Sequence, residues 1–178
     1  MRKLSVLTAL LALFLLAVPQ QADAQTSIEV GPRLGIDLGD LEEFFIGADG
    51  RITSDALPVV INPAFDYYFV SSGVDGVDVS AFTIDINALY EFGIDNQAFT
   101  PYAGGGLGIV RFSSSTEAVD TPFGGFGGVS ASTTDVGLNL VGGAKFEAGN
   151  LQPFAQAKIN VGGDFTLFNL MGGLLFSF

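Results

Sequence analysis

Apolar and polar residues alternate with a period of two along most of the chain, and this pattern limits the fold more than any other feature. Residues 82 to 92 illustrate it: Phe82, Ile84 and Ile86 alternate with Thr83 and Asp85. Successive side chains of a β-strand point to opposite faces, so each such run predicts a strand with one apolar and one polar face. The runs cover residues 28–38, 44–52, 59–69, 82–92, 99–112, 135–147, 152–161 and 165–178.

The N-terminus has a different pattern. Arg2 and Lys3 precede an apolar run over residues 4–18, and the sequence Ala22-Asp23-Ala24 has the small-x-small form of a signal-peptidase site. We expect residues 1–24 to be a cleaved signal peptide and residues 25–178 to be the exported domain, with a retained membrane anchor as the alternative. Beyond residue 25 no stretch approaches the roughly 18 apolar residues of a transmembrane helix.

Two arrangements of eight alternating strands are conceivable, a soluble sandwich and a membrane-spanning barrel. Export and the many glycines on the polar face favour the barrel, which also pairs every backbone group without water. The turns near residues 53, 95 and 149 are short, whereas the segment between 112 and 133 is long, as in outer-membrane barrels. The sequence therefore predicts an all-β fold, an eight-stranded antiparallel up-and-down transmembrane β-barrel.

In this arrangement the polar face lines the lumen and the apolar face meets lipid. Eight acidic and five basic side chains are expected to point inward and to form a structural charge network, rather than a proton relay or a substrate track. The acidic surplus should sit near water at the barrel ends or bind a cation. The predicted lumen residues are Glu29, Arg33, Asp37, Asp49, Arg51, Asp66, Asp85, Glu91, Arg111, Asp135, Lys145, Glu147 and Lys158.

Aromatic residues near the strand ends predict interfacial girdles on the lipid-facing side. On the fifth strand, where Gly104, Gly105, Gly106 and Gly108 give no side-chain signal, we place Arg111 inward. The girdle residues are Phe44, Tyr67, Phe69, Tyr90, Phe92, Tyr102, Phe112, Phe146, Phe176 and Phe178, and Val110 is placed outward with them.

Composition excludes several function classes. The chain has no His and no Cys, which removes the usual zinc ligands, Ser-His and Cys-His nucleophile pairs and disulfides. A net charge of −12 makes nucleic acid an unsuitable partner. Acidic clusters at Asp40, Glu42 and Glu43 and at Asp75 and Asp78 are interpreted as solvated loop charges, with divalent-cation binding as the alternative. We expect no metal and no cofactor.

The C-terminal strand ends on Phe178, preceded at alternating positions by Phe176, Leu174 and Leu170. This resembles the C-terminal signature that the outer-membrane assembly machinery recognises. Together with residues 99–108 (FTPYAGGGLG), it is similar to the OmpA/OmpX-type outer-membrane β-barrel domain family. The resemblance covers residues 25–178 and implies a bacterial outer-membrane location, with membrane lipid and the assembly machinery as partners.

The function expected from these observations is that of a non-enzymatic outer-membrane barrel contributing to envelope integrity or surface interaction. The alternative is a small passive porin, or a conduit for small or apolar solutes. Enzymatic barrels of similar form use a catalytic His, which this chain lacks. The loop over residues 113–132 is the candidate contact for an unknown external partner, and a solvated loop without a partner is the alternative.

Overall fold

The computed structural model describes residues 26–71, 76–94, 98–116, 119–121, 124–126, 128–149, 151–163 and 165–178, without side chains for 119–121 and 124–126. The predicted signal peptide, residues 1–24, lies outside the described residues, as does Asp75. Among the described residues, no helix has the length and hydropathy needed to cross a membrane.

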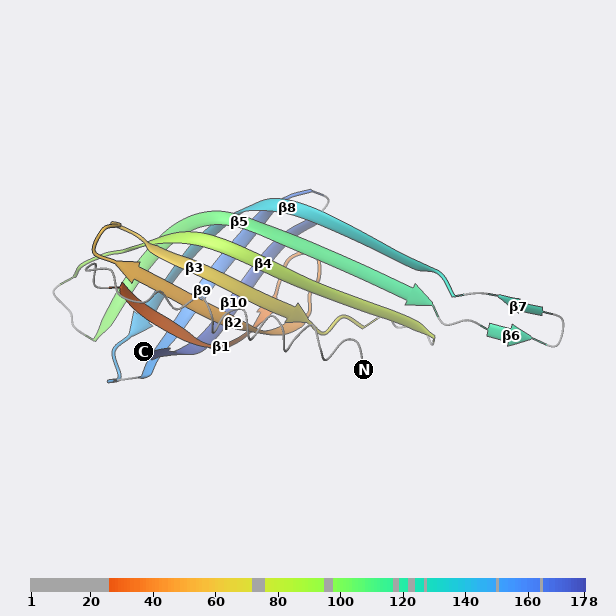
Figure 1. Ribbon diagram of the computed structural model, residues 1–178, viewed down its shortest axis with the longest axis horizontal. Helices are drawn as coiled ribbons and strands as arrows, with labels where there is room; N and C mark the ends of the chain where they lie inside the picture. The colour runs from red at the N-terminus through yellow and green to blue at the C-terminus, as the bar shows by residue number, and fades with distance from the viewer. Residues whose placement is uncertain are drawn as a thin grey trace.

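Eight antiparallel strands close into a barrel, as the alternation predicts, in the order β1-β10-β9-β8-β5-β4-β3-β2 (Figure 1). Among the described strands, the short β6 and β7 pair only with each other. The elements are β1 (Thr26–Asp37), β2 (Phe44–Ser54), β3 (Val60–Tyr68), β4 (Val77–Glu91), β5 (Phe99–Thr116), β6 (Val119–Thr121), β7 (Gly124–Phe126), β8 (Ser130–Phe146), β9 (Leu151–Gly162) and β10 (Phe165–Ser177).

The first and last strands close the barrel. β1 pairs with β10 from Glu29 opposite Ser177 to Asp37 opposite Asn169. Both ends of the described chain therefore lie at one end of the barrel, together with the turns after β2, β4 and β8. Outer-membrane barrels have longer loops at the external end than at the periplasmic end, so we assign the end that carries the long β5–β8 connection, with β6 and β7, as the external end.

The outward face is apolar over the middle of the barrel. Leu34, Ile86, Leu107, Leu138 and Leu140 are each more than half exposed. Aromatic side chains flank this belt on the outside: Phe44, Tyr67 and Phe69 near the external end, and Tyr90, Phe92, Phe146, Phe176 and Phe178 near the periplasmic end. This distribution agrees with the girdles that the sequence predicts for those eight residues.

The fifth predicted strand, β5, has its faces reversed relative to our prediction. Tyr102 and Val110 are 2% and 3% exposed and face the lumen, and Phe112 packs against the inner apolar cluster. Arg111 is exposed on the outer face. The outward-facing positions of β5 are those of Leu107 and Ile109, which are 56% and 40% exposed. Prediction of Tyr102, Val110 and Phe112 as lipid-facing, and of Arg111 as a lumen residue, is therefore wrong.

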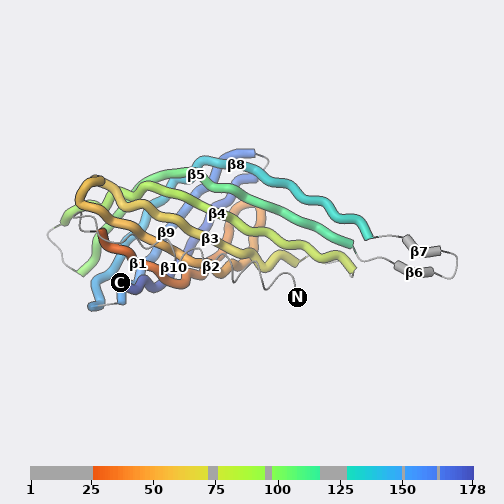
Figure 2. The backbone as a smooth tube through the Cα atoms, in the orientation of Figure 1, coloured from red at the N-terminus to blue at the C-terminus, as the bar shows by residue number. Residues whose placement is uncertain are grey.

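Strands β4, β5 and β8 continue past the other strands at the external end (Figures 1 and 2). Pairing of β5 with β8 extends to Ser115 opposite Ser130, and pairing of β4 with β5 extends to Val77 opposite Thr116. The two ends of the segment 113–132, predicted as a loop, are therefore strand: residues 113–116 and 130–132 form, with the start of β4, a three-stranded extension of the barrel wall. We refer to residues 77–80, 113–116 and 130–134 as the external ribbon.

Candidate functional site

The lumen holds a buried cluster of three carboxylates and three cations. Asp49, Asp66 and Asp85 lie among Arg33, Arg51 and Lys158, and all six residues are at most 2% exposed. They come from β1, β2, β3, β4 and β9, so closure of the barrel brings together residues that are far apart in the sequence. Equal numbers of opposite charges make this central cluster formally neutral.

Arg33 occupies the centre of the cluster. Its Nε and Nη2 donate to the two carboxylate oxygens of Asp66, each at 2.7 Å. Its Nη1 donates to Asp49 Oδ2 at 2.9 Å, and Nη2 lies 3.5 Å from Asp85 Oδ2. A two-pronged contact of this kind matches the planar guanidinium to a carboxylate and fixes both side chains. One cation thus organises all three aspartates.

Lys158 and Arg51 complete the charge balance. The Lys158 ammonium contacts Asp85 Oδ2 and lies 3.4 Å from Asp66 Oδ2. The Arg51 Nε lies 3.2 Å from Asp49 Oδ1, and Nη2 donates to the Tyr102 hydroxyl at 2.8 Å. The same guanidinium lies 4.3 Å from the ring centroid of Tyr102 and 4.9 Å from that of Phe154. Aromatic faces therefore replace water around this cation.

Asparagine side chains extend the network around the wall. Asn62 donates to Asp49, Asn87 donates to Asn62, and Asn139 donates both to Asp85 and to Asn87, over distances of 2.9–3.1 Å. Asn160 donates to Asn139 Oδ1 at 2.7 Å. Alternation predicted the inward direction of these four asparagines, but nothing in the sequence indicated that they bond to one another across β3, β4, β8 and β9.

Glycines on the inward face give these side chains room. A Cβ at Gly108 would lie 2.6 Å from both Asp85 Oδ1 and Asn160 Nδ2, and one at Gly137 would lie 2.4 Å from Asn160 Oδ1. An eight-stranded barrel is just wide enough for its own side chains. The glycine-rich polar face is therefore a consequence of the volume that the charged side chains occupy.

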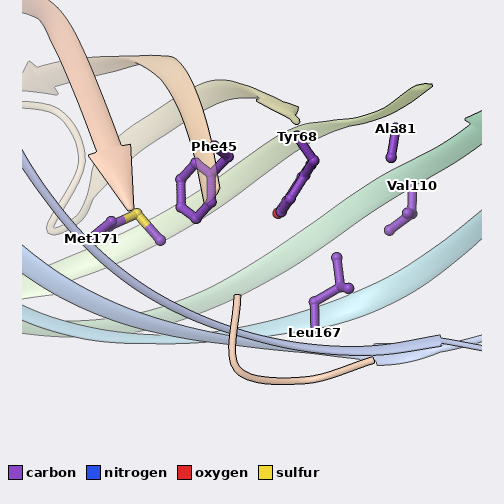
Figure 3. Packing of buried hydrophobic residues seen from close by; sticks show 6 residues of the cluster. All are labelled: Phe45, Tyr68, Ala81, Val110, Leu167 and Met171. Carbon is purple, nitrogen blue, oxygen red and sulfur yellow. The ribbon is translucent and has the colours of Figure 1, made fainter. Parts of the chain in front are cut away.

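Two apolar layers close the polar cluster from above and below. Toward the external end, Phe45, Tyr68, Ala81, Val110, Leu167 and Met171 point toward one another inside the barrel (Figure 3). Toward the periplasmic end, Val60, Leu89, Tyr102 and Val141 form a second cluster. Alternation places Phe45, Tyr68 and Leu89 on the inward face, so the lumen has apolar layers in addition to the polar lining that the sequence predicts.

Five of the seven remaining predicted lumen charges lie toward the ends of the barrel. Lys145 Nζ lies 3.5 Å from Glu29 and 3.1 Å from Glu91 at the periplasmic end. Asp37, at the external end, accepts the N–H groups of Gly39, Leu41, Glu42 and Phe168, so it ties the β1–β2 loop to β10. Asp135 is half-buried opposite Val110. The acidic surplus that the sequence predicts is thus distributed to both ends.

Two predicted lumen residues are placed elsewhere. Glu147 is exposed, because β8 ends at Phe146 and the chain has already entered the turn to β9. Arg111 projects outward, where Nη1 and Nη2 lie 3.4 Å from the hydroxyls of Thr134 and Ser132. Of the thirteen predicted residues, these two do not belong to the lumen.

Two of the acidic loop residues have partners within the protein. Asp40 accepts the N–H of Thr166 at 2.7 Å, and Glu43 accepts the N–H of Ser71 at 3.2 Å. Within the described ranges, no group of three or more carboxylates is placed to hold a metal ion. On β10, Leu170, Leu174 and Phe176 face outward, and Phe178, one residue beyond the strand, is exposed.

Comparison with known families identifies the barrel. A family model described as outer membrane protein beta-barrel domain matches residues 8–174. The chain belongs to this family. It is therefore a protein of the bacterial outer membrane, as the C-terminal signature implied. A sequence comparison with curated proteins finds no match.

Solved structures share the fold of this outer-membrane barrel at low sequence identity. The N-terminal barrel domain of Pseudomonas aeruginosa OprF aligns with a TM-score of 0.62 and 16% identity. The attachment invasion locus protein Ail of Yersinia pestis aligns at 0.60 and 18%, and Neisserial surface protein A at 0.62 and 16%. Each alignment covers 88% of this chain and 100% of the other chain.

Proposed function

We propose that this outer-membrane barrel is closed and non-enzymatic, and that it contributes to envelope integrity or to contacts at the cell surface through its outer wall and external ribbon. The observation that carries the proposal is the layered lumen. A neutral network centred on Arg33 lies between two apolar clusters, and its six charged side chains are at most 2% exposed.

The layers oppose conduction for two physical reasons. An ion crossing the barrel would have to displace Arg33, which has three carboxylate partners, and leave buried charges unpaired, which costs several kcal/mol. It would also have to pass Phe45, Tyr68 and Leu167, which offer it no polar ligand beyond the Tyr68 hydroxyl. This arrangement favours a sealed lumen over the alternative, a small passive porin.

The same network supports the absence of enzymatic activity. Asp49, Asp66 and Asp85 are each engaged by a cation and lie away from solvent, so none is available as an acid or a nucleophile for an external substrate. The chain also has no His or Cys that could serve in their place.

The external ribbon is the part of the wall best suited to meet a partner outside the cell. Among the described strands, none pairs with the ribbon residues of β8 on the β9 side, because the β8–β9 pairing begins at Leu138. Ail was also solved with the heparin analogue sucrose octasulfate. This chain presents only Arg111 as an outward cation among its described residues, so we do not extend binding of such a polyanion to it.

Conductance across planar lipid bilayers tests the closed lumen. Protein refolded in detergent and inserted at neutral pH should give no steady current above bilayer leak, while a large-pore porin in the same bilayer gives clear steps. The folded state is checked independently by the change in gel mobility on heating. Steady unitary conductance of the folded wild-type barrel would contradict a sealed lumen and support the porin alternative.

Loss of the protein tests the envelope role. Cells that lack it should admit more of a hydrophobic fluorescent dye, and expression of the wild-type chain should restore exclusion. Restoration by the Arg33→Met variant at equal amounts of folded protein is also expected, because the proposed role depends on the outer surface. Unchanged dye entry and unchanged surface adhesion in cells without the protein would contradict the proposed role.

A further inference from the structure

Arg111 differs from every other cation that the structure describes. Arg33, Arg51, Lys145 and Lys158 lie in the lumen, each with a carboxylate within 4.0 Å. Arg111 is exposed on the outer wall and, among the described residues, has no carboxylate within that distance. An outward cation on a chain of net charge −12 is available for an external anion.

Arg111 lies on β5 at the edge of the apolar belt. The outward residues of β5 run from Leu107 and Ile109 to Arg111 and then to Ser113. On the two neighbouring strands, Arg111 pairs with Phe82 of β4 and Thr134 of β8. The change from aliphatic to aromatic, cationic and hydroxyl side chains marks the boundary between hydrocarbon and headgroups. Arg111 therefore lies at headgroup depth in the outer leaflet.

A groove beside Arg111 is lined with hydroxyl groups. It has a volume of about 580 Å³ and includes Tyr67 together with Ser80, Ser113, Ser115, Ser130 and Ser132. The guanidinium contacts the hydroxyls of Thr134 and Ser132 at 3.4 Å, which is long for a hydrogen bond. Since arginine carries five N–H donors, most of its capacity remains free for a stronger acceptor.

One acidic residue, Asp78, also lines the groove, and it lies at the far end. Asp78 is opposite Ser115, four residues along β5 from Arg111, which corresponds to about 14 Å along the strand. Across water at physiological salt this exceeds the screening length of about 8 Å. An anion at Arg111 is therefore only weakly repelled by Asp78.

We propose that Arg111 and the adjoining serine and threonine hydroxyls bind the phosphate of a phosphorylated glycolipid headgroup in the outer leaflet. The guanidinium supplies a two-pronged contact to phosphate oxygens, and the groove supplies partners for sugar hydroxyls. A membrane lipid is favoured over a free anion because the acidic chain repels free anions, whereas a lipid phosphate is concentrated at this depth. The proposal does not depend on whether the lumen conducts.

Native mass spectrometry of the detergent-solubilised full barrel tests this site. Wild-type protein is mixed with bisphosphorylated lipid A, with the same lipid lacking both phosphates, or with inorganic phosphate alone. Wild type should retain the phosphorylated lipid preferentially. Loss of one charged hydrogen-bonding group should lower that retention about tenfold in Arg111→Gln, and Arg111→Lys should fall between the two.

Ala56→Gln is the matched control, because it places the same side chain in the exposed turn after β2, at the other end of the barrel from the groove, and it should bind as wild type. Every variant is first required to show the wild-type gel shift on heating. Equal retention of the phosphorylated lipid by Arg111→Gln and wild type would overturn the proposal, as would equal retention of both lipids by wild type. Displacement of the lipid by millimolar inorganic phosphate would show a general anion site and overturn the lipid assignment.

Discussion

At the residue scale, the stability of the lumen depends on how many partners each buried charge has. Arg33 contacts Asp49, Asp66 and Asp85 and is buried. Lys145 forms ion pairs with Glu29 and Glu91 near the periplasmic opening. Removing one member of a buried ion pair leaves the other charge without compensation, which is more costly than the pair is stabilising. The two cations should therefore respond very differently to neutral substitution.

We predict that Arg33→Met lowers the free energy of unfolding by about 3 to 5 kcal/mol, measured by urea titration in lipid vesicles. The reason is that two cations would then face three buried aspartates. Lys145→Met should cause a smaller loss, since the Glu91 side chain is 28% exposed and reaches water. Adding Asp66→Asn to Arg33→Met should recover part of the loss by restoring neutrality. Equal losses for the two single variants would contradict the central role of Arg33.

Glycines in β8 offer a second contrast at single positions. We predict that Gly137→Ala destabilises the barrel by about 1 to 3 kcal/mol, because its methyl group would meet the Asn160 side chain. Gly142→Ala on the same strand should be neutral or slightly stabilising, since nothing lies within 4 Å of its added Cβ. Both values come from the same urea titration. A neutral Gly137→Ala would show that the asparagine network has spare room.

At the element scale, the period-two pattern was sufficient to predict eight strands, their order along the chain and most of their faces. It failed on β5, where four glycines carry no side-chain information and the choice of face followed Arg111. Leu107 and Ile109 were the better guide, because two large aliphatic residues outweigh one cation at the membrane boundary. The rule that charged residues face the lumen holds within the apolar belt and ends where the headgroups begin.

Strand length was less predictable than strand number. Serine and threonine are compatible with loops and with exposed strands, so residues 113–116 and 130–134 gave no signal for the β5–β8 pairing that the structure shows.

The contacts between side chains within the lumen could not be predicted from the sequence either. Alternation gives a side chain's face, but contacts such as Arg33 to Asp66 depend on strand stagger and closure.

The tip of the external ribbon should be dispensable for folding. We predict that replacing residues 117–128 by Asn-Gly, which favours a tight hairpin turn and keeps Thr116 opposite Val129, leaves the heat-dependent gel shift intact, because among the described strands β6 and β7 pair only with each other. Deletion of Leu107 alone is the control: it shifts the β4–β5–β8 register by one residue and exchanges the two faces, so folding should fail. Loss of the folded band in the tip deletion would show that this segment supports the barrel.

At the scale of the whole molecule, side chains of different chemistry lie on different parts of the barrel. Most charged side chains of the strands pair inside, aliphatic side chains meet lipid, and the hydroxyl-rich ribbon with Arg111 projects from one end. Such a molecule has an absolute orientation in the membrane. The ends of the described chain and the turns after β2, β4 and β8 share one end, and the ribbon occupies the other.

The absence of cysteine makes this orientation directly measurable with single-cysteine variants. Val129 is 70% exposed beside the ribbon, and Ala56 is exposed in the turn after β2. We predict that a membrane-impermeant maleimide labels Val129→Cys on intact cells, but labels Ala56→Cys only after the outer membrane is permeabilised. Wild type provides the unlabelled control. Labelling of Ala56→Cys on intact cells, with protection of Val129→Cys, would reverse the orientation and place Arg111 in the inner leaflet, away from the glycolipid that it is proposed to bind.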